Sequence, residues 1–456
     1  MRSNPLRWLL LAGAIHITLT LAIFLVGHFQ LVPALVDSYG TVGANPSLPI
    51  DSTAYRNLSS QLANELQANG VSAWLAIKAP LHCRFYSLLF ATAGRLLGHN
   101  ILAAEPLNVV YYLGVLICVY CLGRELFNTR AGLLASFIAG AWPTFLVQST
   151  QLIRDSLSIL CLLALVLLLT LLLTRALSWR VGLASGLGGA ALLTFFWVIR
   201  GNMWNVVILA IGVAIVLLAL RMIRVSGFIP GNVIAITLVL IAMLLVPPRF
   251  ESTSLYGKRL PITPLSIPSG TQPAPAEGVF TRAIKQIGER RAGFRSYRAH
   301  ESDVDADVRL VTVGDVLKYI PRAAVVGFFA PFPRLWFERG NYGRAGRLLT
   351  GAETLAMYFL YAAAGVCFWR HRRELPVWLL FLVATLATIA LGLVVVNAGA
   401  LYRLRYVFWI LFIVMAAESL VHFTVLRTNS TKSRMSSSVV SNDDINRHSD
   451  VSSFQT

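Results

Sequence analysis

An acidic residue stands at the start of a helical pattern in the first long polar stretch of the chain. Asp51 is followed by apolar residues that recur every four positions: Ala54, Leu58, Leu62 and Leu66. This spacing places the apolar side chains on one face of a helix suited to a membrane surface. Two interpretations of Asp51 stay open: a helix cap, or a general base held where water meets lipid.

A second acidic residue lies where a long apolar run begins. Asp155 directly follows Arg154, and the apolar run starts at position 156. Acidic side chains at such a boundary are either ordinary interface residues or, where they face a cavity, functional groups. The sequence leaves both interpretations open.

Arginines occur near the ends of two other apolar runs. Arg403 and Arg405 precede the last run, and Arg200 ends an earlier one. A guanidinium group presents a fork of donors that matches phosphate. The pattern therefore indicates either a site for a lipid phosphate or side chains that reach up to lipid headgroups.

Membrane spans are the elements that must position these residues. Of the 456 residues, 56% are hydrophobic and 13% charged, whereas soluble domains have roughly 25% charged residues. This composition excludes a disordered chain and argues against a soluble one. Ten apolar runs approach the length of about 20 residues that a bilayer requires. They lie near 8–30, 102–123, 131–150, 156–174, 181–199, 204–222, 230–248, 352–369, 376–396 and 405–425.

The net charge of +18 comes from basic residues that flank the apolar runs, and so indicates a membrane rather than nucleic acid. With a cytoplasmic N-terminus, most of the flanking arginines face the cytoplasm. They are Arg124, Arg130, Arg175, Arg180, Arg221, Arg224, Arg370, Arg372 and Arg373. This grouping requires that 80–98 and 319–337 lie at the interface or re-enter the membrane. Both termini are then cytoplasmic, and the candidate residues above face outside.

The same topology divides the chain into four parts. They are an N-terminal membrane module at 1–248 with a first external loop at about 36–101, a large external loop with an interfacial segment at 249–351, C-terminal transmembrane helices at 352–426, and a tail at 427–456. The tail is rich in Ser, Asn and Asp, which predicts disorder. The first apolar run is interpreted as an uncleaved span because it is long and no small-x-small cleavage site follows it.

Several motifs, taken in order, resemble the GT-C superfamily of membrane glycosyltransferases. The resemblance is closest to the family 39-like branch of protein O-mannosyltransferases and lipid A aminoarabinose transferases. The motifs are Asp51–Tyr55 before the amphipathic helix, Phe85–Gly98, Gly123–Phe127, Arg130–Leu134, Arg154–Ser156 and Leu401–Arg405. The resemblance implies an all-α, polytopic integral membrane protein with about 10 transmembrane helices plus interfacial helices, of the GT-C type.

The resemblance also implies an activity. A sugar would pass, with inversion, from a polyprenyl-phosphate-linked donor to an acceptor hydroxyl or amine on the outer or lumenal face. Asp51 would be the base, Asp155 would position the acceptor or the sugar, and Arg403 and Arg405 would hold the leaving phosphate. The remaining expected substrate-binding residues are Tyr55, Arg154, Arg200 and Tyr402. No cofactor is expected. Some family members bind a divalent metal, but the sequence offers no recognisable ligand set for one.

The expected partners are a polyprenyl-phosphate sugar donor, membrane lipids and an acceptor that is a protein, a lipid or a glycan, with no nucleic acid. Short loops favour a bacterial inner membrane. The main alternative function is a transporter or flippase of lipid-linked sugars, and others are a polysaccharide polymerase or ligase and a structural subunit. Transporters place polar groups near mid-membrane and often repeat halves, whereas here the charges lie at the rim and no halves repeat.

Overall fold

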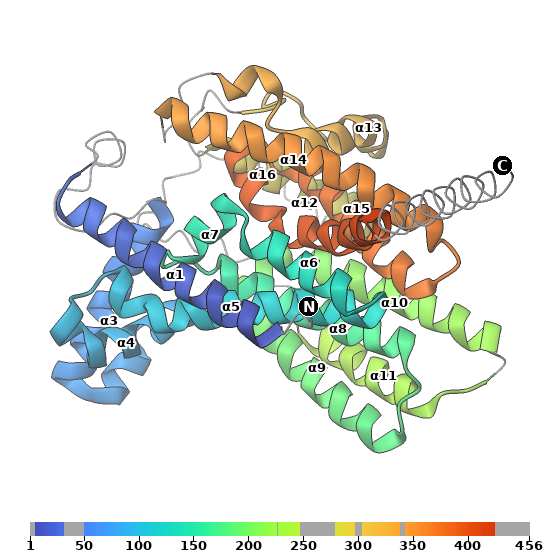
Figure 1. The fold of residues 1–456 in the computed structure, drawn as a ribbon, viewed down its shortest axis with the longest axis horizontal. Coiled ribbons are helices and arrows are strands. Elements are labelled where there is room, and N and C mark those ends of the chain that lie inside the picture. The colour runs from blue at the N-terminus through green and yellow to red at the C-terminus, as the bar shows by residue number, and fades with distance from the viewer. Residues whose placement is uncertain are drawn as a thin grey trace, which may run out of the picture.

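The computed structural model describes residues 5–31, 50–225, 227–246, 279–296, 303–337 and 343–424. Within these ranges the regular structure is helical apart from an isolated β-bridge, so the all-α prediction is confirmed (Figure 1). The predicted tail at 427–456 and the proline-rich start of the large external loop, at 247–278, lie outside the described residues.

The helices run in chain order as follows, with a C-terminal helix at Tyr406–Thr424 after them. They are α1 (Pro5–His28), α3 (Ile50–Ala76), α4 (Leu81–Leu97), α5 (Ile101–Leu126), α6 (Thr129–Gly140), α7 (Pro143–Ser149), α8 (Asp155–Thr174), α9 (Trp179–Arg200), η1 (Gly201–Met203), α10 (Trp204–Val225), α11 (Pro230–Leu245), α12 (Val279–Ser296), α13 (Val313–Phe329), η2 (Pro333–Trp336), α14 (Gly343–Arg370), α15 (Leu375–Val394) and α16 (Ala398–Leu404).

Eight of the ten predicted spans are helices long and apolar enough to cross a membrane: α1, α5, α8, α9, α10, α14, α15 and the C-terminal helix. The polytopic prediction is therefore confirmed. The predicted span at 131–150 is instead the pair α6 and α7, bent by 69°. Pro143 begins α7 at this break, where a proline cannot continue the backbone hydrogen bonds of the preceding helix. The predicted span at 230–248 is the shorter helix α11, of 16 residues.

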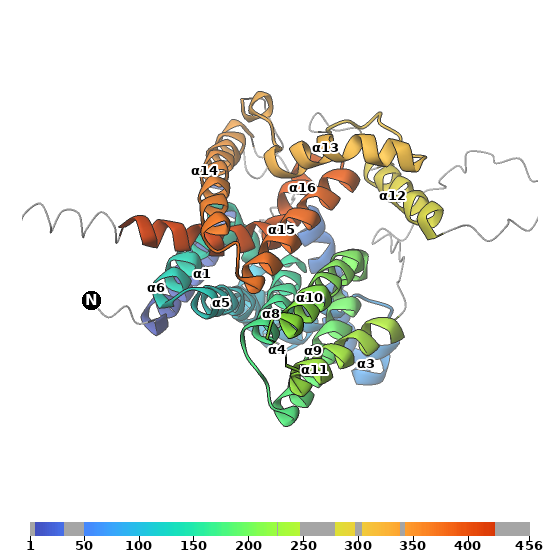
Figure 2. The ribbon, with the colours of Figure 1, turned by 90° about the vertical axis from the view of Figure 1, so that its right-hand side faces the viewer.

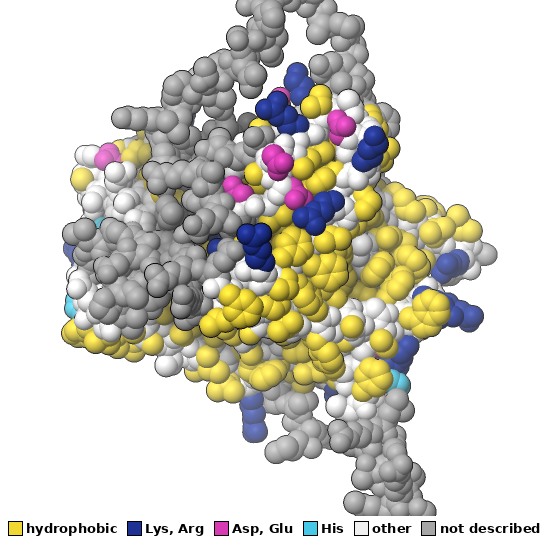
Figure 3. Space-filling view, turned by 90° about the horizontal axis from the view of Figure 1, so that it is seen from above, with side chains coloured by type: hydrophobic (Ala, Val, Ile, Leu, Met, Phe, Trp, Pro, Cys, Tyr) yellow, Lys and Arg dark blue, Asp and Glu magenta, His cyan; other side chains and the backbone are white. Residues whose placement is uncertain are grey.

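Burial differs strongly among these helices. The C-terminal helix and α8 are the most enclosed, whereas α1 buries few residues and presents large apolar side chains outward. Figure 3 shows one face of the molecule, on which hydrophobic side chains cover a broad area and acidic and basic side chains gather in a group beside it. Such an apolar surface suits contact with lipid. The polar groups of the backbone are hydrogen-bonded within the helices and so need no partner in the lipid.

Several arginines gather at one end of the bundle. At this end the Arg175 guanidinium pairs with Glu125, with 2.5 Å between Nη2 and Oε2. There too Arg224 Nη1 donates to the Arg373 carbonyl at 3.3 Å. These contacts place several of the predicted cytoplasmic arginines together, at the opposite end of α8 from Asp155.

The described part of the large loop is attached to the C-terminal helices. α12 and α13 lie together beside α15 (Figure 2). Arg291 of α12 is buried and donates to the carbonyl oxygens of Val308, at 3.1 Å, and Leu393, at 3.0 Å. Asp305 pairs with Arg322 of α13 at 2.9 Å. This loop is therefore positioned to fix the helices that follow it.

Candidate functional site

Three charged side chains from different helices meet where α8 begins. The carboxylate of Asp155 accepts a hydrogen bond from Arg200 Nη1, and Arg403 Nε lies 3.2 Å from the other carboxylate oxygen. Asp155 and Arg200 are both 5% exposed, whereas the Arg403 side chain is 25% exposed. The sequence predicted all three as site residues, and the structure brings them together in what we call the Asp155 cluster: Asp155, Arg200 and Arg403.

Helix ends position this cluster. Asp155 is the first residue of α8, and Arg200 is the last residue of α9. Arg403 lies on the short helix α16, whose N-cap Asn397 accepts a hydrogen bond from Ala400 N at 3.0 Å. Asn397 also donates to Asp303 Oδ1 at 3.0 Å, so the large loop helps to hold α16.

The charges of the cluster favour an anion. Arg154 precedes Asp155 directly, so three guanidinium groups surround one carboxylate. Arg200 Nε is buried without a hydrogen-bond partner among the described residues. A buried donor without a partner carries a free-energy cost that a ligand can remove. Phosphate oxygens are well suited to the forked donors of arginine.

The first external segment packs beside the cluster. The ring of Tyr55, on α3, meets His82 of α4 edge to face, with centroids 4.4 Å apart. Tyr55, Cys83 and Ile153 share one buried contact group, and Ile153 precedes Arg154. Asp51 lies in the first turn of α3, and its side chain is outside the described positions. The backbone therefore brings the predicted base's turn, Tyr55 and the start of α8 to one region.

His82 is a residue of this region that the sequence did not select as a site residue. It is 1% exposed, and its Nδ1 has no hydrogen-bond partner among the described residues. Burial, with a smaller contribution from the positive charge of Arg154, lowers the pKa of His82 from 6.5 to about 3. No sequence signal separated it from an ordinary core histidine.

This pKa predicts an acid dependence of stability. The unfolded chain takes up a proton on His82 below pH 6.5, but the folded chain does not until about pH 3. The stability contributed by neutral His82 is therefore complete above pH 6.5 and declines as the pH falls, by up to about 1.4 kcal/mol per pH unit. Thermal unfolding in detergent between pH 7 and 5 should shift less in His82→Gln than in wild type. The exposed His28→Gln should keep the wild-type slope, and an unchanged slope in His82→Gln would contradict the prediction.

Two predicted residues face a different group of side chains. Tyr402 donates to Glu353 of α14, and Thr144 donates to the same carboxylate through its backbone N at 2.8 Å and its hydroxyl at 2.7 Å. Arg405 is 1% exposed, donates to the Gly327 carbonyl at 3.1 Å and lies outside the Asp155 cluster. Both Tyr402 and Arg405 thus hold neighbouring helices in place.

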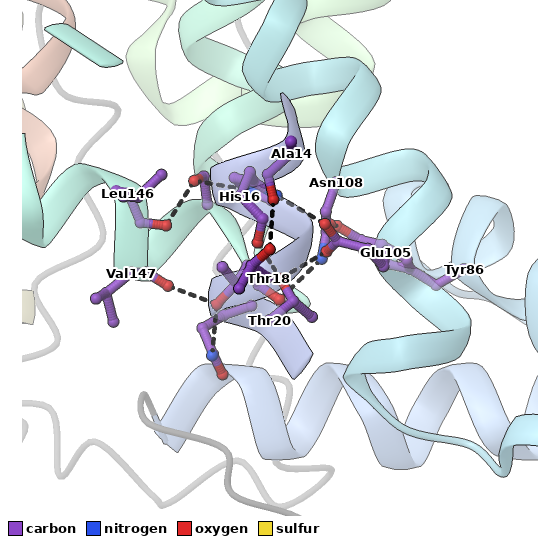
Figure 4. A network of polar contacts seen from close by, with 12 residues as sticks. Ala14, His16, Thr18, Thr20, Tyr86, Glu105, Asn108, Leu146 and Val147 are labelled. Atoms are coloured by element: carbon purple, nitrogen blue, oxygen red, sulfur yellow. Dashed lines mark hydrogen bonds and ion pairs between the residues drawn. The ribbon is translucent and has the colours of Figure 1, made fainter. Parts of the chain in front are cut away.

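A third polar network joins α1 to α5 (Figure 4). His16 Nδ1 lies 2.7 Å from Glu105 Oε1, His16 Nε2 lies 3.0 Å from Ser149 Oγ, and Thr20 donates to Glu105 at 2.8 Å. No sequence motif links these residues. His16, Glu105 and Ser149 each lie in a different apolar run, so their spacing in the chain does not indicate that they contact one another.

Among the described residues, the Asp155 cluster is not part of a group of three His, Cys, Asp or Glu side chains close enough together to hold a metal ion. The described group of three His, Cys, Asp or Glu side chains that is close enough to hold an ion is elsewhere: Cys367, His371 and Glu418. A divalent metal at the Asp155 cluster therefore has no ligand set among the described residues.

No protein-family model and no curated protein sequence matches the chain. Two solved structures are similar over 94% of its length, each at 13% identity. One is the oligosaccharyltransferase of Archaeoglobus fulgidus in the apo form, with a TM-score of 0.45. The other is the archaeal oligosaccharyltransferase AglB from the same organism in complex with an inhibitory peptide and a dolichol-phosphate, with a TM-score of 0.47. The chain spans about half of each, 52%. At this identity and these scores the likeness assigns neither a family nor an activity.

Proposed function

We propose that this chain is a membrane glycosyltransferase of the GT-C type that uses a polyprenyl-phosphate-linked sugar. The proposal is supported above all by the Asp155 cluster, in which buried Asp155 orients Arg200 and Arg403 at one end of the bundle. The phosphate of a polyprenyl phosphate lies at the membrane surface, where the ends of the spanning helices lie, while its apolar chain stays among the lipids. On the predicted topology, this end of the bundle faces the outside.

Each member of the cluster has its own part in the proposed binding of the donor. Asp155 holds the two guanidinium groups in register, since a carboxylate accepts hydrogen bonds from both sides. Arg403 is the partly exposed cation and contacts the phosphate, with Arg154 close by. Arg200, which is enclosed, supplies positive charge from behind. Preorganised charges of this kind stabilise a leaving group as its negative charge develops.

The proposed reaction is a single displacement. The acceptor oxygen or nitrogen forms a bond to the anomeric carbon, and its proton passes to the Asp51 carboxylate. The bond between the anomeric carbon and the phosphate oxygen breaks, and its electron pair stays on the polyprenyl phosphate beside Arg403. Attack opposite the leaving group inverts the anomeric centre. Tyr55, four residues after Asp51 on α3, belongs to the buried contact group that includes Ile153, just before Arg154.

The test follows release of free polyprenyl phosphate. Membranes that hold wild-type protein and endogenous acceptors receive a panel of polyprenyl-phosphate sugars. Asp51→Asn should lower release from the productive donor by roughly 10²–10⁴-fold, the usual contribution of a general base. Glu65→Gln, which removes a carboxylate farther along the same helix, should keep the wild-type rate.

The outcomes separate the alternatives. Equal release by wild type and Asp51→Asn, at equal protein level, would remove Asp51 as the base. If wild type releases phosphate from no donor but moves a labelled lipid-linked sugar between leaflets, the flippase becomes the better interpretation.

A further inference from the structure

A cysteine, a histidine and a glutamate converge at the end of the bundle away from the Asp155 cluster. Cys367 lies in the last turn of α14, His371 follows four residues later, and Glu418 comes from the C-terminal helix. One sulfur, one ring nitrogen and one carboxylate oxygen of the three lie within 4.8 Å of one another. Cys367 and Glu418 are buried, and His371 is partly exposed. The proposed sugar transfer makes no use of them.

The imidazole of His371 is oriented as in metal sites. Its Nδ1 lies 2.8 Å from Glu374 Oε1, a contact between residues three apart in the chain. A histidine that binds a metal through one ring nitrogen almost always donates its other N–H to a carboxylate or carbonyl. That hydrogen bond fixes the proton on Nδ1 and leaves the lone pair of Nε2 available.

The second ring nitrogen faces another electron-rich atom. His371 Nε2 lies 3.3 Å from Glu418 Oε1, yet it makes no hydrogen bond among the described residues. Two lone pairs that approach this closely repel unless a proton or a metal cation lies between them. Two ligands of a tetrahedral Zn²⁺, with bonds of roughly 2.0–2.1 Å, are separated by roughly 3.3 Å. The observed spacing is therefore that of two ligands of one ion.

We propose that Cys367, His371 and Glu418 form a Zn²⁺ site. Sulfur, imidazole nitrogen and carboxylate oxygen are the three donor types that Zn²⁺ takes in proteins, and a bound ion deprotonates the thiol. Three protein ligands leave a fourth position for water. The His371 side chain is 22% exposed at the predicted cytoplasmic end of the bundle.

Arg370 is the residue that opposes the ion. Its Nη1 lies 3.0 Å from Glu418 Oε1 and 3.3 Å from Oε2. A zinc ion takes Oε1, and Arg370 stays on Oε2 as an outer partner of the ligating carboxylate. Its positive charge lowers the affinity for a second cation, so the site binds more weakly than the same ligands would without it.

Zinc would join α14 to the C-terminal helix, and both helices extend to the end of the bundle that holds the Asp155 cluster. α14 carries Glu353, and the C-terminal helix begins with Tyr406. The hydroxyl of Thr144 forms hydrogen bonds with both the Glu353 carboxylate and the Tyr406 hydroxyl. Without metal, Glu418 contacts Arg370 and His371 and forms a side-chain hydrogen bond with Cys367. A bound ion would replace the Cys367–Glu418 hydrogen bond by coordination of both side chains to one ion.

Metal binding to the full-length protein in detergent tests the proposal without any assay of sugar transfer. After chelation and desalting, one Zn²⁺ should bind per chain. Co²⁺ should give the thiolate charge-transfer band and the intense visible bands of a tetrahedral cysteine-ligated ion. Cys367→Ser should lose the charge-transfer band, whereas Cys161→Ser, another buried thiol, should keep it.

Two further variants separate coordination from a structural role. Glu374→Gln should weaken Zn²⁺ by roughly 10–100-fold, the usual effect of removing an outer partner of a ligand. Arg370→Gln should tighten it, a change in the opposite direction from loss of structure. Wild-type protein that binds no Zn²⁺ or Co²⁺, or a thiolate band that persists in Cys367→Ser, would overturn the proposal.

Discussion

Asp155→Ala is expected to lower the free energy of unfolding by about 3–5 kcal/mol, the usual cost of removing one partner from a buried ion pair. The reason is that Arg200, at 5% exposure, keeps its charge in an enclosed position after the carboxylate is gone. Arg403 can turn toward solvent because its side chain is 25% exposed. The loss therefore comes chiefly from Arg200 and is measured by unfolding of the detergent-solubilised protein in a denaturant series.

A second substitution identifies the cause. Asp155→Ala combined with Arg200→Met removes both charges and restores an apolar side chain of similar length, so most of the lost stability should return. Asp315→Ala is the control: it removes an exposed aspartate from the capping box of α13 and should cost far less than Asp155→Ala. A double variant as unstable as the single one would show that Asp155 stabilises the fold by another route.

Hydropathy was sufficient to predict most of the helices, because a bilayer demands about 20 apolar residues whatever the tertiary contacts. At 131–150 it predicted one uninterrupted span, whereas the chain forms the bent pair α6 and α7, with Pro143 at the start of α7. It also overestimated the length of α11. Composition over a window is insensitive to the single residue that interrupts a helix.

The site was predicted in part for a different reason. Asp155, Arg200 and Arg403 were each selected by charge at the end of an apolar run, but their mutual contact depends on how α8, α9 and α16 meet. Arg405 was selected with Arg403, and the structure places it elsewhere. Residues two apart on a helix point to different faces. A spacing of two therefore does not favour contact of both arginines with one phosphate. The contact between Tyr402 and Glu353 joins residues far apart in the chain, and no motif around either residue indicates it.

Arg403→Ala is expected to lower donor turnover by roughly 10²–10³-fold, the usual effect of removing one group that stabilises developing negative charge. Of the cations in the cluster, Arg403 is more exposed than Arg200 and stays anchored to Asp155 at 3.2 Å. Stability should change little, because Asp155 keeps Arg200 as a partner. Release of polyprenyl phosphate at saturating donor, measured with the donor found in the Asp51→Asn experiment, checks the prediction.

The exchange of Arg403 for lysine distinguishes phosphate recognition from a general effect of charge. Lysine keeps the positive charge but offers a compact ammonium in place of a planar fork of donors. Arg403→Lys should therefore retain more turnover than Arg403→Ala and still fall below wild type. Arg130→Ala, which removes an exposed arginine at the start of α6, should leave turnover unchanged. If Arg403→Ala kept the wild-type rate, the leaving phosphate would have to bind elsewhere, and the Asp155 cluster would be a structural ion pair at the mouth of the bundle.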